Sequence, residues 1–220
     1  MKISFIGHAC FMIEDGDYSL IIDPFIEGNP SAKVKNNDVK PTHILVSHAH
    51  GDHKGDAVSL AKKTKAKIFS TFEIGNELAT HGVDVIAGHI GGKAKTEFGS
   101  IKFFQAFHGS GIAGGYACGF VVNIGGKKIY HAGDTGLTKD MELLKRENID
   151  YALLPIGDFY TMGPEDALEA VKMIKPKYAI PMHYNTFPPI CQDPELFKKT
   201  VESKTDSKVI VLQPGEFLEI

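Results

Sequence analysis

Two stretches of the chain show the same order of predicted elements, with short strands first and helices alternating with strands afterwards. In the first stretch, Asp15-Gly16 between two apolar runs is typical of a hairpin turn. Strands are predicted in this stretch at 2–6, 10–14, 19–23, 42–47 and 67–70, and helices at 55–64 and 73–81. Gly82 directly follows the helix predicted at 73–81 and favours the end of that helix.

The second stretch repeats this order, and Gly125-Gly126 joins two of its strands in a typical hairpin signal. Its strands are predicted at 101–107, 117–124, 128–131, 151–155, 178–182 and 209–212, and its helices at 137–147, 164–174 and 194–204. No linker rich in Pro, Gly or Ser separates the two stretches. We therefore expect one domain over residues 1–220, in which two similar halves close into a sandwich with helices on its outer faces.

The overall composition excludes several classes of protein. A formal net charge of −3 argues against a protein that coats nucleic acid or binds an anionic membrane. No window approaches about 18 uninterrupted apolar residues, so no membrane span is expected. Cys10, Cys118 and Cys191 have no CxxC spacing, which argues against a thiolate zinc site or a redox dithiol. The N-terminus lacks the apolar run of a signal peptide, and we expect a cytoplasmic protein.

Histidine is unusually frequent, with 10 residues, and four potential metal ligands fall within one hexapeptide. This segment, His48-x-His50-x-Asp52-His53, directly follows the buried strand predicted at 42–47. Strand geometry would place His48 and His50 on one face, and a turn or helix start would direct Asp52 and His53 to a second point. The segment can therefore supply ligands to two metal ions. The alternative, a solvated polar loop, fits poorly with the apolar residues that precede it.

Three more potential ligands stand directly after predicted apolar strands, namely His108, Asp134 and His183. A lone histidine beside an apolar run is more often a hydrogen-bonded structural residue than a ligand. Strand ends are where α/β proteins tend to place their chemistry. Three such residues in one chain with the histidine-rich hexapeptide predict a metal site.

These motifs resemble the five ordered motifs of the metallo-β-lactamase superfamily. The resemblance rests on Asp23 in Ile22-Asp23-Pro24, the hexapeptide 48–53, His108, Asp134 in Gly133-Asp134-Thr135, and His183. Three further segments resemble the group of small metal-dependent hydrolases that is similar to ascorbate-6-phosphate lactonases and, more distantly, to N-acyl-phosphatidylethanolamine phospholipase D. They are Phe5-Ile6-Gly7-His8-Ala9, Pro155-Ile156-Gly157 and the segment 161–167.

The resemblance implies an α/β (α+β) fold, a four-layer αββα sandwich with a dinuclear metal site between the loops of its sheets. It implies that His48, His50 and His108 hold one metal, that Asp52, His53 and His183 hold the other, and that Asp134 bridges both. Such ligands suit zinc best, with manganese, nickel or iron as alternatives. Two divalent ions activate a water molecule and polarise an electrophile. Asp52 then becomes a candidate proton acceptor, and Asp23 an anchor for a liganding histidine.

Other polar residues are expected around the metals. The resemblance places His8 at the mouth of the cleft, where it would stabilise substrate charge or protonate a leaving group; an ordinary hairpin histidine is the alternative. Residues expected to line the substrate pocket, or merely to cap their loops, are Asp158, Tyr160, Thr161 and Asn185. His131 is expected to pack against or orient the site. The Gly-rich segment 109–115 is predicted to form either a flexible rim over the cleft or a long hairpin loop.

The function expected from these features is metal-dependent hydrolysis of a small phosphodiester or ester, with hydrolysis of a sugar lactone, phosphorylated or not, as the alternative. A bridging Asp134 in place of a cysteine ligand argues against true β-lactamase activity. Arg146 is the one arginine among 24 cationic residues, which disfavours a strongly phosphorylated substrate. A non-catalytic metal-binding protein is less expected, because structural zinc sites are usually closed and rich in cysteine. We expect a small-molecule substrate and no nucleic-acid or membrane partner, and the sequence is compatible with a homo-oligomer.

Overall fold

The computed structural model describes all 220 residues and contains two seven-stranded sheets. The first sheet has the order β14-β1-β2-β3-β4-β5-β6. Its strands are β1 (Lys2–Gly7), β2 (Cys10–Asp15), β3 (Tyr18–Ile22), β4 (His43–Leu45), β5 (Lys67–Thr71), β6 (Val85–Gly88) and β14 (Phe217–Glu219). Pairing is antiparallel from β14 through β3 and parallel from β3 through β6.

The second sheet repeats this arrangement, with the order β13-β12-β11-β10-β9-β8-β7. Its strands are β7 (Lys93–Thr96), β8 (Gly99–Gln105), β9 (Cys118–Ile124), β10 (Lys127–His131), β11 (Tyr151–Pro155), β12 (Tyr178–Met182) and β13 (Lys208–Val209). Pairing is antiparallel from β7 through β10 and parallel from β10 through β13. Each sheet thus begins as an antiparallel meander and continues as parallel strands joined through helices.

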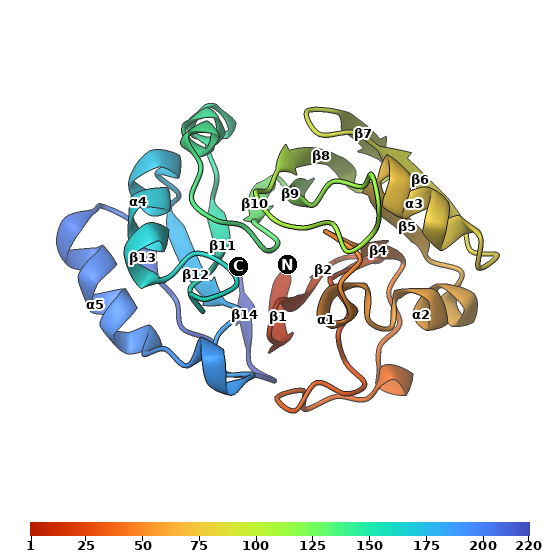
Figure 1. The fold of residues 1–220 in the computed structure, drawn as a ribbon, viewed down its shortest axis with the longest axis horizontal. Coiled ribbons are helices and arrows are strands. Elements are labelled where there is room, and N and C mark those ends of the chain that lie inside the picture. Colours follow the sequence, from red (N-terminus) through yellow and green to blue (C-terminus); the bar gives the residue numbers. More distant parts are fainter.

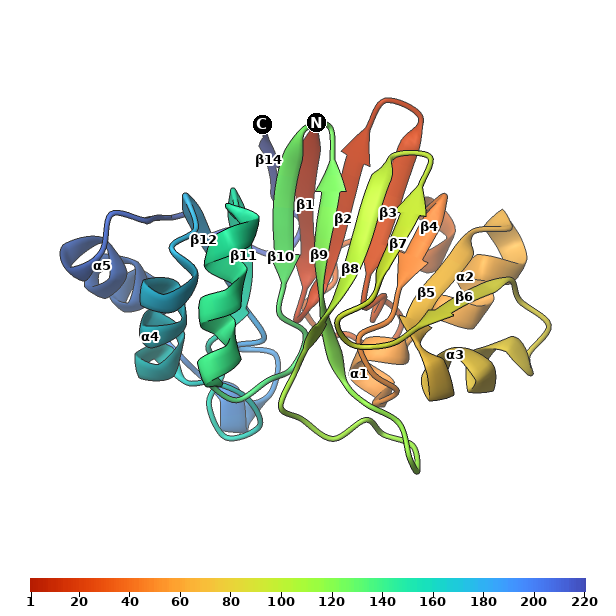
Figure 2. The ribbon, with the colours of Figure 1, turned by 90° about the horizontal axis from the view of Figure 1, so that it is seen from above.

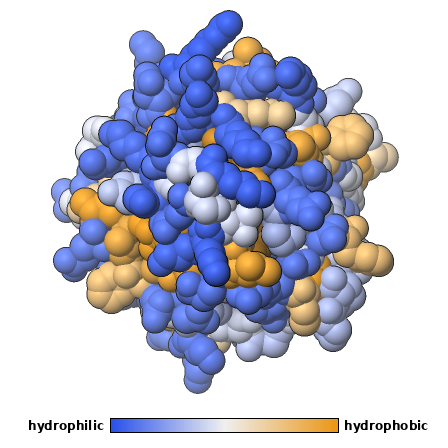
Figure 3. Space-filling model, turned by 90° about the vertical axis from the view of Figure 1, so that its left-hand side faces the viewer, coloured by the Kyte–Doolittle hydropathy of each residue, from blue (hydrophilic) through white to orange (hydrophobic).

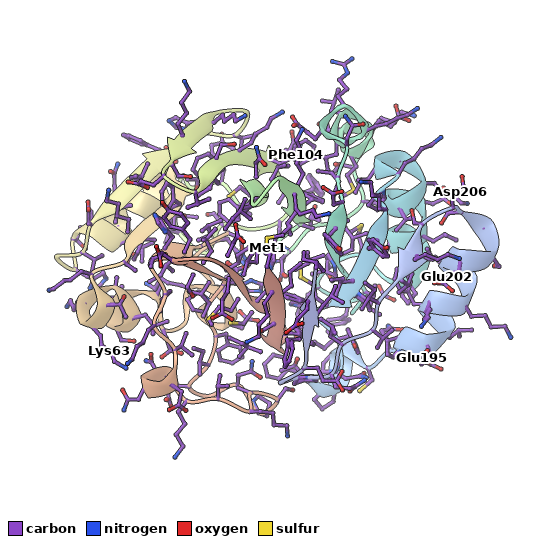
Figure 4. All side chains as sticks on the ribbon, turned by 180° about the vertical axis from the view of Figure 1, so that it is seen from behind. Met1, Lys63, Phe104, Glu195, Glu202 and Asp206 are labelled. Carbon is purple, nitrogen blue, oxygen red and sulfur yellow. The ribbon has the colours of Figure 1, made fainter.

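Helices cover the outer face of each sheet, so that the sheets lie between two helical layers (Figures 1 and 2). The helices are α1 (Gly51–Lys54), α2 (Ala57–Thr64), α3 (Phe72–Ala79), α4 (Pro164–Ile174) and α5 (Pro194–Lys204), with 3₁₀ turns η1 (Asn36–Asp38), η2 (Lys139–Glu147) and η3 (Pro188–Ile190). Lys63 on α2 and Glu195 and Glu202 on α5 lie at opposite ends of the molecule (Figure 4). This architecture confirms the predicted α/β sandwich.

Strand alternation separates the two hydrophobic clusters of the interior. On β3, Leu20 and Ile22 belong to the larger cluster, whereas Ile21 between them belongs to the cluster that includes Leu60 of α2 and Leu78 of α3. Successive side chains of a strand point to opposite faces, so one strand can contribute to both clusters. The sheet therefore has two buried faces, which explains why its parallel strands read as continuous apolar runs.

Two predicted elements differ from the structure. The segment 137–147 was expected to form an α-helix and instead contains the 3₁₀ segment η2, whose buried residues Met141 and Leu144 are three apart. Three residues make one turn of a 3₁₀ helix, so this spacing buries both side chains on one face. The strand predicted at 209–212 is limited to β13, and the chain then crosses to the first sheet, where β14 pairs with β1. Strands β6, β7 and β14 were not predicted.

One edge of the two sheets gathers most of the residues with unusual backbone conformations. Three of the non-glycine residues with positive φ end helices, namely Lys65, Asn148 and Lys175. The other six stand in loops that follow strands: His8, Asp23, Asp158, Phe159, His183 and Asn185. Left-handed backbone in non-glycine residues is strained and concentrates at functional sites. This edge is therefore the part of the fold where a functional site is expected.

The outer surface over α4 and α5 carries mostly polar side chains, with apolar side chains gathered in a few patches (Figure 3). None of the helices combines the length and the apolar character that a bilayer-spanning segment requires.

Candidate metal centre

The seven predicted ligands come from four places where a strand has just ended. The hexapeptide follows β4 and enters α1, which begins at Gly51 and brings Asp52 and His53 into its first turn. His108 follows β8, Asp134 follows β10, and His183 directly follows β12. Because β8 and β10 both run antiparallel to β9, their carboxyl ends lie at the same edge of the second sheet. Figure 2 shows α1 and the loops after these strands below the ends of both sheets.

The potential ligand atoms converge in three overlapping groups, and within each group they lie within 4.8 Å of one another. The groups are His48 with His50 and His108; His8 with Asp52, His53 and His183; and His48 with His53 and Asp134. The structure thus brings together all seven residues, from both halves of the chain, and adds His8 to them. No cysteine takes part: Cys10 and Cys118 are buried free thiols elsewhere, and Cys191 is exposed.

Asp134 lies between the first group, which contains His108, and the second group, which contains His53 and His183. One carboxylate oxygen, Oδ1, is 3.2 Å from His53 Nε2, and the other, Oδ2, is 3.1 Å from His183 Nε2 and 3.6 Å from His108 Nε2. Its side chain is almost fully buried. Burial alone would raise the pKa of this carboxyl group, but the charge on His53 and the contacts with His183 hold its pKa well below the usual range.

A second buried carboxylate, Asp23, orients the histidines from behind. Its Oδ2 accepts a hydrogen bond from His53 Nδ1 at 2.8 Å and another from Ser47 Oγ at 2.6 Å. Ser47 Oγ in turn lies 2.9 Å from His48 Nδ1. Since the Ser47 hydroxyl proton goes to Asp23, Ser47 Oγ accepts the proton of His48 Nδ1. Both histidines therefore present an unprotonated Nε2 to the centre when they are neutral.

The polar atoms at the centre fit a bound cation. His48 Nε2, His53 Nε2 and Asp134 Oδ1 are buried and have no hydrogen-bond partner, although such groups are costly when unpaired. Burial disfavours a charged His53, yet Asp134 and Asp23 on either side raise its pKa well above the usual value. The cluster thus favours positive charge at its centre. Divalent transition metals bind imidazole nitrogens together with carboxylate oxygens.

His8 is part of this cluster rather than a free side chain at the cleft mouth. Its ring is buried, with Nε2 3.2 Å from Asp52 Oδ2 and Nδ1 3.0 Å from Thr186 Oγ1. Burial lowers the pKa of His8 to about 4, so the ring is neutral at neutral pH. A carboxylate only accepts hydrogen bonds, so Nε2 carries the ring proton and donates it to Asp52, while Nδ1 accepts from the Thr186 hydroxyl.

The loops that support the cluster are also hydrogen-bonded to it. His131 Nε2 donates to the carbonyl of Ala9 and its Nδ1 accepts from the Gly133 amide, which holds the turn before Asp134. Ala49 N donates to the carbonyl of Ser110, so the Gly-rich segment 109–115 packs on the hexapeptide. A Cβ on Gly111 would lie 2.8 Å from the His50 backbone nitrogen, and only glycine permits this approach.

The other predicted pocket residues serve mainly their own loops. Asp158 Oδ1 accepts from the Phe159 amide, Thr161 Oγ1 donates to the carbonyl of Met162, and Asn185 Oδ1 accepts from the Gln192 amide. Asp158 and Asn185 also line a groove of about 1110 Å³ between α4 and α5.

Sequence reasoning missed two residues of the site, Ser47 and Thr186. Ser47 is signalled by its place between a buried strand and the hexapeptide. Thr186 has no sequence signal, since it meets His8 from 178 residues away.

Known proteins resemble this chain over its full length. Residues 2–183 match the family model described as a beta-lactamase superfamily domain. The chain belongs to the metallo-β-lactamase superfamily. A protein of Desulforamulus reducens named as a UPF0173 metal-dependent hydrolase is 54% identical, with all of both chains covered. A protein of the same name from Thermococcus onnurineus is 48% identical, also with full coverage of both.

A solved structure extends this relationship to the fold. The metallo hydrolase Igni18 of Ignicoccus hospitalis superposes with a TM-score of 0.93 at 40% identity, covering 100% of this chain and 98% of its own. The present protein is a metal-dependent hydrolase of this superfamily, with a candidate metal-binding cluster of histidines and aspartates.

Removal of bound metal from this hydrolase is expected to lower its melting temperature. Metal at about 100 times its dissociation constant stabilises a protein by about 2.7 kcal/mol. In a chain of this length, that corresponds to a shift of about 5–10 °C. Differential scanning fluorimetry before and after chelator treatment, with zinc or manganese added back, measures the shift. An unchanged melting temperature after verified metal loss would contradict a site within the folded core.

Proposed function

We propose that this hydrolase holds two divalent metal ions and uses them to hydrolyse a small ester, either a carboxylic ester or lactone or a phosphodiester. The observation that carries this proposal is the position of Asp134, a buried carboxylate whose Oδ1 faces His53 of one ligand set and whose Oδ2 faces His108 of the other set as well as His183. A carboxylate that can bridge two ligand sets suits a dinuclear hydrolytic site.

The two ligand sets follow the geometry of the clusters. We assign His48, His50 and His108 to one metal, Asp52, His53 and His183 to the other, and Asp134 to both. Zinc suits these donors best, and manganese, nickel and iron are compatible with them. Asp23 supports the assignment from behind, since it fixes His53 directly and His48 through Ser47.

The pair of metal ions would supply Lewis acidity and an activated water when bound. Asp52 is the ionised side chain best placed to move a proton, because its carboxylate is one-third exposed while the other carboxylates of the cluster are buried. It would accept the proton of the attacking water and return it to the leaving group.

His8 acts on Asp52 rather than on the substrate. Its Nε2 proton is donated to Asp52, so it is not free to protonate a leaving group. The His8 backbone carbonyl also accepts from the amide of His183 at 2.7 Å. We therefore propose that His8 is a positioning residue that holds Asp52 and the start of the His183 loop together.

The experiment that tests this function compares two ester classes on protein of known metal content. Metal-depleted protein is reconstituted with zinc, manganese, nickel or iron(II), and is assayed with bis(p-nitrophenyl) phosphate and with γ-butyrolactone. We expect two metal ions per chain and turnover that depends on them. Turnover of the lactone alone would remove the phosphodiester from the proposal. Metal-loaded protein that hydrolyses neither class would overturn it.

A further inference from the structure

Three large apolar side chains beside the metal centre are unusually exposed. Phe107 is 72% exposed, Phe159 is 73% exposed and Tyr160 is 52% exposed, while the core around them is fully buried. The rings of Phe159 and Tyr160 contact each other edge to face, with centroids 4.7 Å apart. Scattered exposed apolar residues are ordinary, but a group of them next to a reactive site points to a ligand.

Hydrogen bonds tie these aromatic residues to the loop of the central carboxylate. Thr135, which follows Asp134, accepts from the Phe107 amide through its Oγ1 and from the Met162 amide through its carbonyl. Phe107 itself directly precedes His108. The three rings are therefore carried by loops that are hydrogen-bonded to the same segment, at the metal centre.

The backbone under Phe159 is strained. Asp158 and Phe159 have φ values of 61° and 53°, so two successive non-glycine residues are left-handed. Each such residue costs on the order of 1 kcal/mol. The conformation is held by Asp158, whose amide donates to the Met162 carbonyl and whose Oδ1 accepts from the Phe159 amide. The strain does not bury the ring of Phe159, which contacts Tyr160 but is left largely in solvent.

Five loop segments around the centre carry no cationic side chain. Residues 24–31, 107–117, 134–138, 157–163 and 184–192 contain neither lysine nor arginine. Beyond these loops, Lys54 pairs with Glu77 and Lys139 with Glu142. Within these five segments an anionic group on the non-reacting part of a substrate would meet no cation, whereas an apolar group would meet aromatic rings, including Phe187, 5.4 Å from His8.

We propose that the substrate is an uncharged carboxylic ester or lactone whose apolar side chain packs on Phe159, Tyr160 and Phe107. This inference rests on the proposed function and adds to it an apolar, uncharged non-reacting part of the substrate; the carboxylic ester is the proposed class that is uncharged throughout. Phe159 and Tyr160 are specificity-determining residues: they hold the apolar part of the substrate while the ester group faces the metal centre. Water adds to the ester carbonyl and the C–O bond breaks, so an open ester gives a carboxylate, an alcohol and a proton, and a lactone gives one hydroxycarboxylate and a proton.

The test compares lactones that differ in charge and in apolar length. The metal-reconstituted enzyme is assayed with γ-butyrolactone, γ-nonalactone and 6-phosphogluconolactone. We expect kcat/KM to be greatest for γ-nonalactone. The Phe159→Asn/Tyr160→Ala double variant should lose about tenfold in kcat/KM for γ-nonalactone, the loss expected when roughly two methylene groups lose an apolar contact. Its kcat/KM for γ-butyrolactone should stay within about twofold.

The substitution at Phe159 was chosen to suit the left-handed backbone at that position. Asparagine tolerates the left-handed conformation of Phe159, so the loop is retained. Phe217→Asn is the matched control, since Phe217 is 54% exposed on β14, where it lies under Lys2. It removes an exposed ring without touching these loops, and should change none of the three rates. Equal losses on all lactones, or preference for the phosphorylated lactone, would overturn the proposal.

A binding measurement separates failure of this inference from failure of the proposed function. The chain has no tryptophan, so Tyr160→Trp introduces a single tryptophan reporter into the aromatic group. Titration of this variant with γ-nonalactone should change its emission in a saturable way even in metal-free protein, and γ-butyrolactone should not. If no ester is hydrolysed, the proposed function fails, and this titration alone decides the substrate class. Absence of saturable binding would overturn the inference.

Discussion

Replacement of Asp134 by asparagine is expected to abolish most turnover, with kcat reduced by about three orders of magnitude. Asparagine keeps the shape of the side chain but removes the charge that faces His53 and His183 at 3.2 and 3.1 Å. The same carboxylate belongs to both proposed ligand sets, so the metal content should fall from two ions to one or none per chain. Elemental analysis and steady-state kinetics on the same preparation measure both effects.

The control for this variant is His81→Gln. His81 is exposed and pairs with Glu77 four residues before it, outside the cluster. Its replacement should leave metal content and kcat unchanged, which shows that loss of a histidine as such is harmless. Retention of two metals and normal turnover in Asp134→Asn would rule out a bridging role for Asp134.

Replacement of His8 by asparagine is expected to lower kcat by about 10–100-fold, the range typical for residues that orient a metal ligand. The variant loses the Nε2 proton that His8 donates to Asp52 at 3.2 Å. Asparagine suits the left-handed backbone at this position, where φ is 60°, so the fold should be retained. Metal content should stay at the level of the unmodified protein, and KM should change little. Steady-state kinetics and elemental analysis on the same preparation check the fall in kcat and the unchanged metal content.

Two further variants distinguish positioning from a merely structural role. His8→Gln offers an amide donor in place of the imidazole and should recover part of the lost kcat. Thr186→Val removes only the hydroxyl that donates to His8 Nδ1 and should have a smaller effect than loss of the ring. Loss of metal in His8→Asn would make His8 a ligand, and unchanged kcat would make it a bystander.

Local sequence patterns predicted much of the fold. Helices α4 and α5 and strands β11 and β12 have the bounds expected from their apolar spacing and from the prolines that begin the helices. The hexapeptide was expected to turn after His50, and α1 begins at Gly51. Predictions were less successful where a segment depends on a distant partner. Strand β14 has three residues and little apolar pattern, and it forms because β1 offers an unpaired edge.

The sequence by itself determined the kind of chemistry, because ligand types, their spacing and the preceding apolar strands are local properties. It marked His48, His50, Asp52 and His53 as one unit. Apart from Asp23, which the family resemblance named as an anchor, only the tertiary structure decided which side chains support that unit, because these contacts join segments far apart in the chain. Asp23 reaches Ser47 across 24 residues, and Thr186 reaches His8 across 178. The exposed rings beside the centre depend on the folded loops in the same way. The contact of Asp23 with Ser47 joins the ends of the neighbouring strands β3 and β4, and that of Thr186 with His8 forms only when the two sheets pack together, so no local pattern marks either of them.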